Sequence, residues 1–278
     1  MAEDPAPPPA SPDLPTVAPL FPRPHGPGAA RLRRLFLHGF SVMDIAEPLC
    51  SFDAGQPAAA VREVLETEAF DLVGVRKDGF VAGYALREEL FEGDLGDSLH
   101  PFEADDLVTE ESSLAGTIQS LHANGRCFVS SLGSVGYIVT FDDLEKPPVR
   151  MWLFGMVTIL EMAMSARLRE EYPDDSWVKA LSEERVARAR ELWGERLRRG
   201  RICELADCLQ FADKATVLLK TPGRPAQLGF QSKRRADEAF AEFQSLRNSL
   251  AHTQEIISSD WQAVVRLAGS LELLLRAV

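Results

Sequence analysis

The sequence predicts a mixed α+β fold in which two small α/β modules precede an all-helical domain. A helix–strand–turn–strand–helix pattern occurs twice between about residues 36 and 150, and its closing segments, at Leu90 and Leu144, lie 54 residues apart. Beyond Pro147 and Pro148 the apolar residues follow the spacing of helices. A chain of 278 residues is long enough to bury a core in more than one such unit.

The first thirty residues hold ten of the eighteen prolines, in runs such as Pro7-Pro8-Pro9. Such a segment has little apolar surface to bury and favours extended, solvated conformations. We therefore expect a disordered proline-rich tail over residues 1–30.

The first module is expected over residues 31–95 and the second over residues 96–148. In the first, the pattern predicts a helix over 58–69, strands over 70–75 and 80–85, and a closing helix from residue 87. In the second, it predicts a helix over 113–123, strands over 126–130 and 135–139, and a closing segment over 140–144. Neither module has much core of its own, so the two should pack on each other.

The second copy ends with Ile138-Val139-Thr140-Phe141-Asp142-Asp143-Leu144. This ending resembles that of CBS domains, in which an apolar strand is followed by Thr or Ser and, three residues later, by Asp. The two copies together resemble a tandem CBS pair, or Bateman module. The resemblance implies that Asp143 binds the ribose hydroxyls of an adenosine nucleotide (AMP, ADP or ATP) and that Thr140 contacts its phosphate. A carboxylate accepts from both hydroxyls, and a hydroxyl beside a helix N-terminus favours an anion.

The sequence departs from the CBS pattern at several positions. Tyr137 occupies the place of the usual glycine in the second copy, where it would line and crowd the ligand pocket. The first copy has Leu86 for the threonine and Glu89 for the aspartate, so its site is expected to be lost. The alternative for the second copy is purely structural, with Thr140 as a helix cap and Asp143 as favourable first-turn charge.

The last domain is expected over residues 149–278 as a bundle of helices. The apolar spacing and the Pro and Gly breaks predict helices over 150–172, 177–199, 202–220, 232–251 and 260–277.

One polar cluster, Leu246-Arg247-Asn248-Ser249-Leu250-Ala251-His252, lies late in this bundle. It resembles the motif of the HEPN superfamily, an arginine followed by a polar residue and, a few residues later, a histidine. The resemblance implies a homodimer and a metal-independent ribonuclease site made of Arg247, Asn248 and His252. Histidine can move a proton near neutral pH, and arginine can hold the scissile phosphate through its planar fork. The alternative is a non-catalytic dimerisation or binding module in which these residues only brace the helix end.

Three more polar residues lie in apolar helices of this domain. Glu161 needs a partner if it is buried, and Arg247 and Lys214 are the expected ones. Asp213 and Lys214 are expected to form a helix-packing ion pair rather than a catalytic dyad.

Charge and cysteine usage exclude several function classes. Residues 41–150 hold 21 acidic and seven basic side chains, whereas residues 151–278 are nearly neutral, which argues against general coating of nucleic acid. Four scattered cysteines form no CxxC pair, so we expect reduced thiols and no metal site. Cys203 and Cys208, expected on one helix, should suit no local bridge. With no apolar leader and no span of about 20 apolar residues, a cytoplasmic protein without membrane contact is expected.

Three functional hypotheses remain open. The first is an adenosine-nucleotide sensor whose HEPN-like domain is a non-enzymatic binding or dimerisation output. The second is a nucleotide-regulated HEPN endoribonuclease that acts on RNA through Arg247 and His252. A third is a CBS scaffold that binds no nucleotide. The whole architecture resembles that of bacterial proteins, and none of the hypotheses requires a cofactor.

Overall fold

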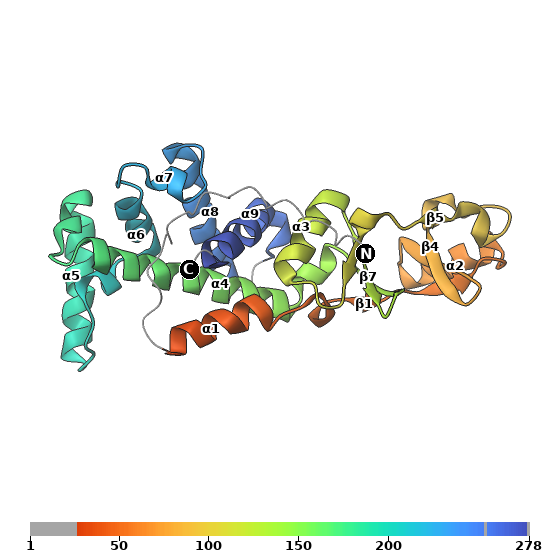
Figure 1. The fold of residues 1–278 in the computed structure, drawn as a ribbon, viewed down its shortest axis with the longest axis horizontal. Coiled ribbons are helices and arrows are strands. Elements are labelled where there is room, and N and C mark those ends of the chain that lie inside the picture. Colours follow the sequence, from red (N-terminus) through yellow and green to blue (C-terminus); the bar gives the residue numbers. More distant parts are fainter. Residues whose placement is uncertain (1–26, 253–254, 277–278) are drawn as a thin grey trace, which may run out of the picture.

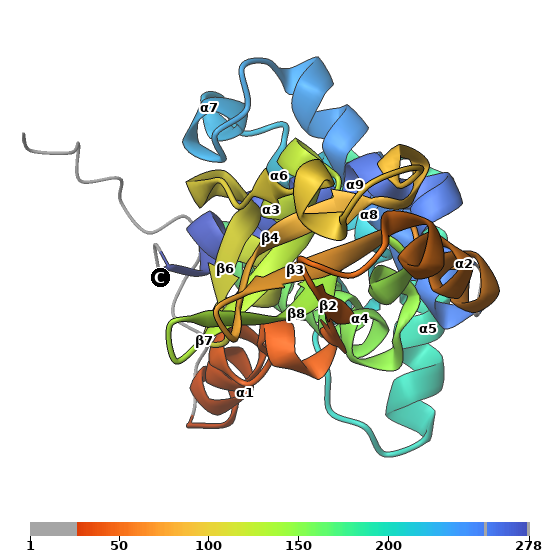
Figure 2. The same cartoon turned by 90° about the vertical axis from the view of Figure 1, so that its right-hand side faces the viewer.

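The computed structural model describes residues 27–252 and 255–276, so most of the expected N-terminal tail lies outside the described residues. The molecule is elongated, with the first α/β module at one end, the second in the middle and the helices at the other end (Figure 1). Seen along the long axis from the first-module end, the strands of the first sheet lie in front of those of the second (Figure 2). The mixed α+β class that the sequence predicts is confirmed.

The first sheet has the strand order β2-β3-β4-β5. Its strands are β2 (Ser51–Asp53), β3 (Leu72–Lys77), β4 (Phe80–Leu86) and β5 (His100–Pro101), and helix α2 (Ala58–Glu68) connects β2 to β3. Strand β2 runs parallel to β3, and the other neighbours are antiparallel. A parallel pair joined by a helix and followed by a hairpin is what the predicted pattern requires.

The second sheet repeats this arrangement with the strand order β1-β8-β7-β6. Its strands are β1 (Glu47–Pro48), β6 (Leu107–Thr109), β7 (Cys127–Ser131) and β8 (Ser134–Val139), and helix α3 (Leu114–Asn124) connects β6 to β7. The closing segments are short 3-10 turns rather than the expected helices: η2 (Arg87–Glu89) in the first copy and η5 (Asp142–Glu145) in the second.

One edge strand of the second sheet comes from far earlier in the chain. Strand β1 precedes the whole first sheet, yet it pairs antiparallel with β8, placing Glu47 opposite Ile138 and Pro48 opposite Tyr137. The amide of Leu49 continues this contact by donating to the carbonyl of Gly136 at 2.9 Å. The second sheet is therefore built from chain segments that come before the first sheet (β1) and after it (β6, β7 and β8).

The helical part is organised around one long helix. Its helices are α1 (Pro27–His38), α4 (Pro147–Glu171), α5 (Glu183–Arg198), α6 (Phe211–Leu218), α7 (Arg224–Gln227), α8 (Lys233–Ala251) and α9 (Ile257–Arg276). The remaining short 3-10 turns of the described residues lie partly in the modules and partly in the helical part: η1 (Val42–Asp44), η3 (Leu95–Ser98), η4 (Ala104–Asp106), η6 (Ser176–Ala180) and η7 (Leu205–Cys208). Helix α4 packs on α6, α8 and α9, and begins at Pro147, a residue that suits a first helical turn.

The predicted helix over residues 202–220 is wrong. Gly200 has a positive φ of 72°, and residues 201–204 have no regular structure. A capping box between Glu204 and Asp207 then starts the separate turn η7, and α6 begins only at Phe211. Local hydrogen bonds of the two carboxylates outweigh the apolar spacing that suggested one continuous helix.

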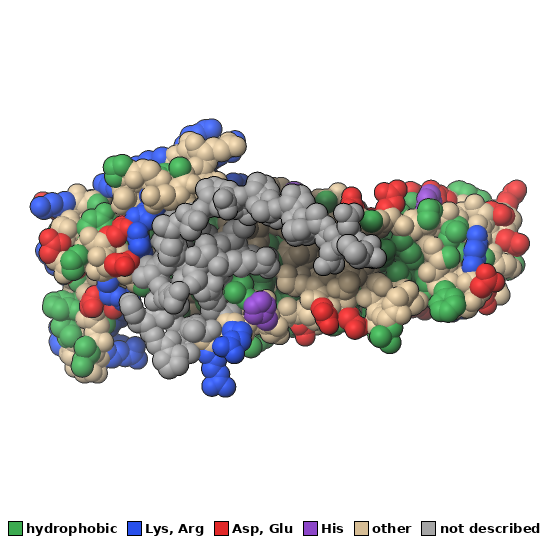
Figure 3. All heavy atoms as spheres, in the orientation of Figure 1, with side chains coloured by type: hydrophobic (Ala, Val, Ile, Leu, Met, Phe, Trp, Pro, Cys, Tyr) green, Lys and Arg blue, Asp and Glu red, His purple; other side chains and the backbone are tan. Residues whose placement is uncertain are grey.

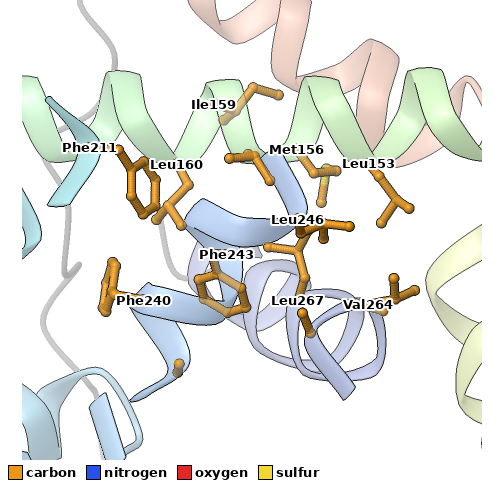
Figure 4. Packing of buried hydrophobic residues seen from close by; sticks show 14 of the residues in the cluster. Leu153, Met156, Ile159, Leu160, Phe211, Phe240, Phe243, Leu246, Val264 and Leu267 are labelled. Carbon is orange, nitrogen blue, oxygen red and sulfur yellow. The ribbon is translucent and has the colours of Figure 1, made fainter. Parts of the chain in front are cut away.

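The described residues form two main hydrophobic cores of unequal size and one small cluster, Tyr84, Phe128 and Val135, that joins the two modules. The first module has its own core, which includes Val61, Leu65 and Val75. The second module shares one continuous core with the helices. Figure 4 shows its centre, where Leu153 and Met156 of α4 meet residues of α8 and α9. The second module and the helical part therefore form one packing unit.

Helix α1 lies along α4 (Figure 1). The indole nitrogen of Trp152 donates to the carbonyl of Phe36 at 2.9 Å. The Phe36 ring lies so close to Gly155 that a Cβ there would be 2.0 Å from it. Glycine at 155 thus permits the close packing of these two helices.

Helix α4 is the one described helix with the length and composition to cross a membrane, and 56% of its apolar window is buried inside the protein. On the face shown in Figure 3, acidic side chains spread over the two modules and most Lys and Arg side chains lie over the helical end. This agrees with the division of charge along the sequence.

Candidate functional site

The corner between β8 and η5 brings Thr140 and Asp143 together. The Asp143 Oδ2 accepts a hydrogen bond from the Thr140 amide at 2.7 Å and another from its hydroxyl at 3.1 Å. Asp143 is only 6% exposed. Thr140 and Asp143, three residues apart in the sequence, are therefore in direct contact. Their hydrogen bonds fix the carboxylate on the turn that leads into α4.

Lys146 completes this corner, and the sequence analysis missed its role. Its ammonium lies 2.8 Å from the Asp143 Oδ1, donates to the Ile45 carbonyl at 2.6 Å and also pairs with Glu47. Burial lowers the pKa of Lys146, but the hydrogen bonds to Asp143 and Glu47 together raise it by more than burial lowers it. The pKa of Lys146 is therefore above its usual value. Its spacing from Asp143 was the one available signal, since Ile45 and Glu47 lie about a hundred residues earlier.

Tyr137 lies apart from this network. It stands opposite Pro48 in the β1–β8 pair, and its half-buried ring packs against the core shared with the helices. No hydrogen bond joins Tyr137 to Thr140 or Asp143 within residues 27–252 and 255–276. The adjacent Gly136 faces open space, with nothing within 4 Å of a Cβ built there.

In the first copy, the corresponding carboxylate is already paired. The Glu89 Oε2 lies 2.5 Å from the His100 Nε2 on β5, and Leu86 offers no hydroxyl. The His100 ring also stacks on Tyr84 with 5.4 Å between ring centres. The expected loss of this site stays a prediction.

The second-copy corner is in direct contact with the helical part. The Glu145 carboxylate pairs with Arg150 of α4 at 3.3 Å and accepts from the Ile256 amide, just before α9, at 2.7 Å. The Phe141 ring meets Trp261 of α9 edge-on, with 5.1 Å between centres. A shift in the position of Asp143 would therefore move residues that contact α4 and α9 directly, because Phe141 and Glu145 lie only two residues away from Asp143.

A second polar cluster joins three helices of the bundle. The Glu161 carboxylate on α4 lies 2.9 Å from the Lys214 ammonium on α6 and 3.5 Å from the Arg247 guanidinium on α8. The expected partners of Glu161 are thus both confirmed. Lys214 is 4% exposed, whereas the Arg247 side chain is 43% exposed. The neighbouring Asp213 pairs instead with Arg185, at 3.2 Å.

Asn248 and His252 are exposed and lie at the C-terminal end of α8. His252 caps this helix, and its amide donates to the Ser249 carbonyl at 3.2 Å. In the described part of the chain, no hydrogen bond links the side chains of Arg247, Asn248 and His252. The structure brings Arg247 to Glu161 rather than to His252.

A search of the described residues finds no group of three or more His, Cys, Asp or Glu side chains that could hold a metal ion. Cavities of about 700 and 250 Å³ lie among the described residues of the helical part. Both border α5, far along the chain from Asp143.

Comparison with known proteins gives no match to a family model and none to a curated protein. Several solved structures that resemble part of the chain are CBS-domain proteins. The CBS-pair protein CBSX2 from Arabidopsis thaliana is 15% identical, covering 38% of this chain and 91% of that one, with a TM-score of 0.33. A structure of CBSX2 in complex with AMP is 17% identical, covering 38% and 93%, with a TM-score of 0.34.

The CBS domain of the bacterial CNNM/CorC family Mg²⁺ transporter, in complex with ATP, is 13% identical, covering 44% of this chain and 94% of that one, with a TM-score of 0.35. Shares of 38–44% leave more than half of this chain without a counterpart in these structures.

Proposed function

We propose that this protein is an adenosine-nucleotide-sensing regulatory protein whose HEPN-like helical domain is a non-enzymatic binding or homodimerisation output. The observation that supports it most is the buried Asp143 carboxylate, held by Thr140 and Lys146 at the corner that leads into α4. Vicinal ribose hydroxyls can replace the Thr140 hydroxyl as donors to this carboxylate. Once the ribose hydroxyls share the Asp143 carboxylate, the Lys146 ammonium is less tightly paired with it and can attract the phosphate.

The same corner supplies the route by which binding would be sensed. Glu145 and Phe141 flank Asp143 in the chain, and they contact Ile256 and Trp261 at the start of α9. A ligand that shifts this turn would change the packing of α9 against α4, provided that it binds one packing of these helices more tightly than another. This gives a binding event a physical output in the helical domain.

Calorimetric titration of the full chain with AMP, ADP and ATP tests the proposal. We use Asp143→Asn, because this replacement keeps the shape of the side chain beside Lys146. At least one nucleotide should bind the wild type, and Asp143→Asn should weaken it by at least tenfold. The matched control is Glu89→Gln in the first copy, which should bind as the wild type does. Absence of binding by all three nucleotides, or equal binding by a folded Asp143→Asn, contradicts the proposal.

A second function, a nucleotide-regulated and metal-independent HEPN endoribonuclease, is favoured by the exposure of Arg247, Asn248 and His252 on one helix end. These three side chains can reach an RNA phosphate from solvent, or meet a second copy of the chain. Because Glu161 already neutralises part of the Arg247 charge, we place this function second. RNA cleavage that depends on AMP or ATP and disappears in His252→Ala would establish it.

A further inference from the structure

Cys203 and Cys208, which the sequence seemed to place on one helix, instead flank the turn η7. Glu204 is the N-cap of this turn. Its carbonyl accepts from the Asp207 amide at 3.1 Å, and the Asp207 side chain accepts from the Glu204 amide at 3.1 Å. Beside such a capping box, the residue before the cap and the fourth residue of the turn often pack against each other. Here these two residues are Cys203 and Cys208.

The contacts of the Cys208 sulfur agree with this placement. It lies 3.9 Å from the carbonyl of Glu204, the residue that follows Cys203, and 3.7 Å from the guanidinium of Arg196 on α5. Burial raises the pKa of the Cys208 thiol, Arg196 opposes this rise, and the neighbouring Cys203 thiol adds to it.

The two cysteines differ in their access to solvent. Cys203 is half-buried and lines the 700 Å³ cavity together with Tyr172, Trp193 and Gly194, whereas Cys208 is 4% exposed. A side chain built at Gly194 would meet nothing within 4 Å, so this wall of the cavity is open. A small reagent can reach Cys203 there, whereas Cys208 is almost fully buried at the wall of the separate 250 Å³ cavity.

We infer that Cys203 and Cys208 form a redox-active dithiol that a low-molecular-weight disulfide such as oxidised glutathione converts into an intramolecular disulfide. The Cys203 thiolate attacks one sulfur of the reagent, and the first glutathione leaves as a thiolate that takes up a proton. Cys208 then loses its proton to water, attacks the Cys203 sulfur and releases the second glutathione. Both protein thiols are oxidised and one molecule of reagent is reduced to two thiols.

The pair lies beside α5 and away from Asp143, so its oxidation does not depend on nucleotide binding. The pair also differs from Cys127, which is fully buried and whose pKa is raised to about 12, mainly by burial. A thiol in such a site is inert towards exchange. Cys127 therefore serves as the internal control.

The experiment treats the reduced full chain with oxidised glutathione, quenches with acid, alkylates remaining thiols with N-ethylmaleimide and digests with trypsin. Residues 202–214 form one tryptic peptide that contains both Cys203 and Cys208 and no other cysteine. This peptide should lose two hydrogens and take up no N-ethylmaleimide, while the Cys127 peptide should be alkylated, once unfolded, as in the untreated protein.

Two variants test the order of attack. Cys208→Ser should accumulate a stable glutathione adduct on Cys203, and Cys203→Ser should leave Cys208 free for alkylation after unfolding. Three outcomes on the wild type overturn the inference: a stable adduct on Cys203, full alkylation of both cysteines, or a disulfide that joins this peptide to another chain.

Discussion

At the scale of single residues, Glu161 shows how far a sequence can predict a polar contact. An isolated carboxylate in an apolar helix requires a cation, and both cations expected from the sequence, Lys214 and Arg247, do contact it. The Thr140–Asp143 contact was likewise predictable because it spans only three residues. Lys146 was not, because Ile45 and Glu47 reach it only through the pairing of β1 with β8.

Replacing Glu161 by Gln should lower the free energy of unfolding by about 3–5 kcal/mol, because it leaves the charge of Lys214 buried without a counter-charge. Replacing Lys214 by Met should cost less, since an apolar chain of similar length removes the charge altogether. Urea unfolding of the three proteins measures both.

The matched control for this pair is Glu238→Gln, which removes an exposed partner of Arg234 and Arg235 and should change stability by less than about 1 kcal/mol. A Lys214→Met variant that loses as much stability as Glu161→Gln would contradict the explanation by an unpaired buried charge.

At the scale of elements, helices and strands of the two modules follow their apolar patterns, whereas the segment from residue 200 to 210 does not. There the short-range bonds of Glu204 and Asp207 decide the structure, and apolar spacing does not report them. The packing of α1 on α4 could not be predicted either, because the residues around Gly155 do not indicate that Phe36 lies next to it.

Replacing Gly155 by Ala should separate α1 from α4, because the added methyl group would lie 2.0 Å from the Phe36 ring. We expect a lower melting temperature and faster amide hydrogen exchange over residues 27–38. Gly194→Ala on α5 is the matched control, since its Cβ meets nothing within 4 Å, and it should stabilise the helix by about 0.5–1 kcal/mol. Unchanged exchange in α1 of Gly155→Ala would show that this close contact is not needed.

At the scale of the whole molecule, the division into separate cores decides which parts are destabilised together by a mutation. The first module has a separate core, while the second module and the helices share theirs. The repeat was visible in the sequence because its period is regular. The shared core was not, because it depends on α3 packing against α9 across more than a hundred residues.

Leu65 and Leu153 make a matched pair for this division, because both are fully buried leucines. Leu65→Ala should destabilise only the first module, and Leu153→Ala should destabilise the second module and the helices together, each by about 2–5 kcal/mol. Native-state hydrogen exchange resolved by segment checks this. Faster exchange of α8 in Leu65→Ala would show that the two cores are coupled.

The pairing of β1 with β8 makes the first module an insertion into the second rather than a unit that simply precedes it. Leu49 and Phe102, at the two ends of the insertion, pack against the same small cluster of Tyr84, Phe128 and Val135. We therefore expect residues 50–101 to behave as an exchangeable cassette. A module from another chain that supplies an apolar residue in place of Tyr84, and so keeps Phe128 and Val135 covered, could replace them while the remaining sheet and the helices keep their fold. In an evolutionary sense, such a cassette could be exchanged without any redesign of the Thr140–Asp143 corner or of the helices that this corner contacts.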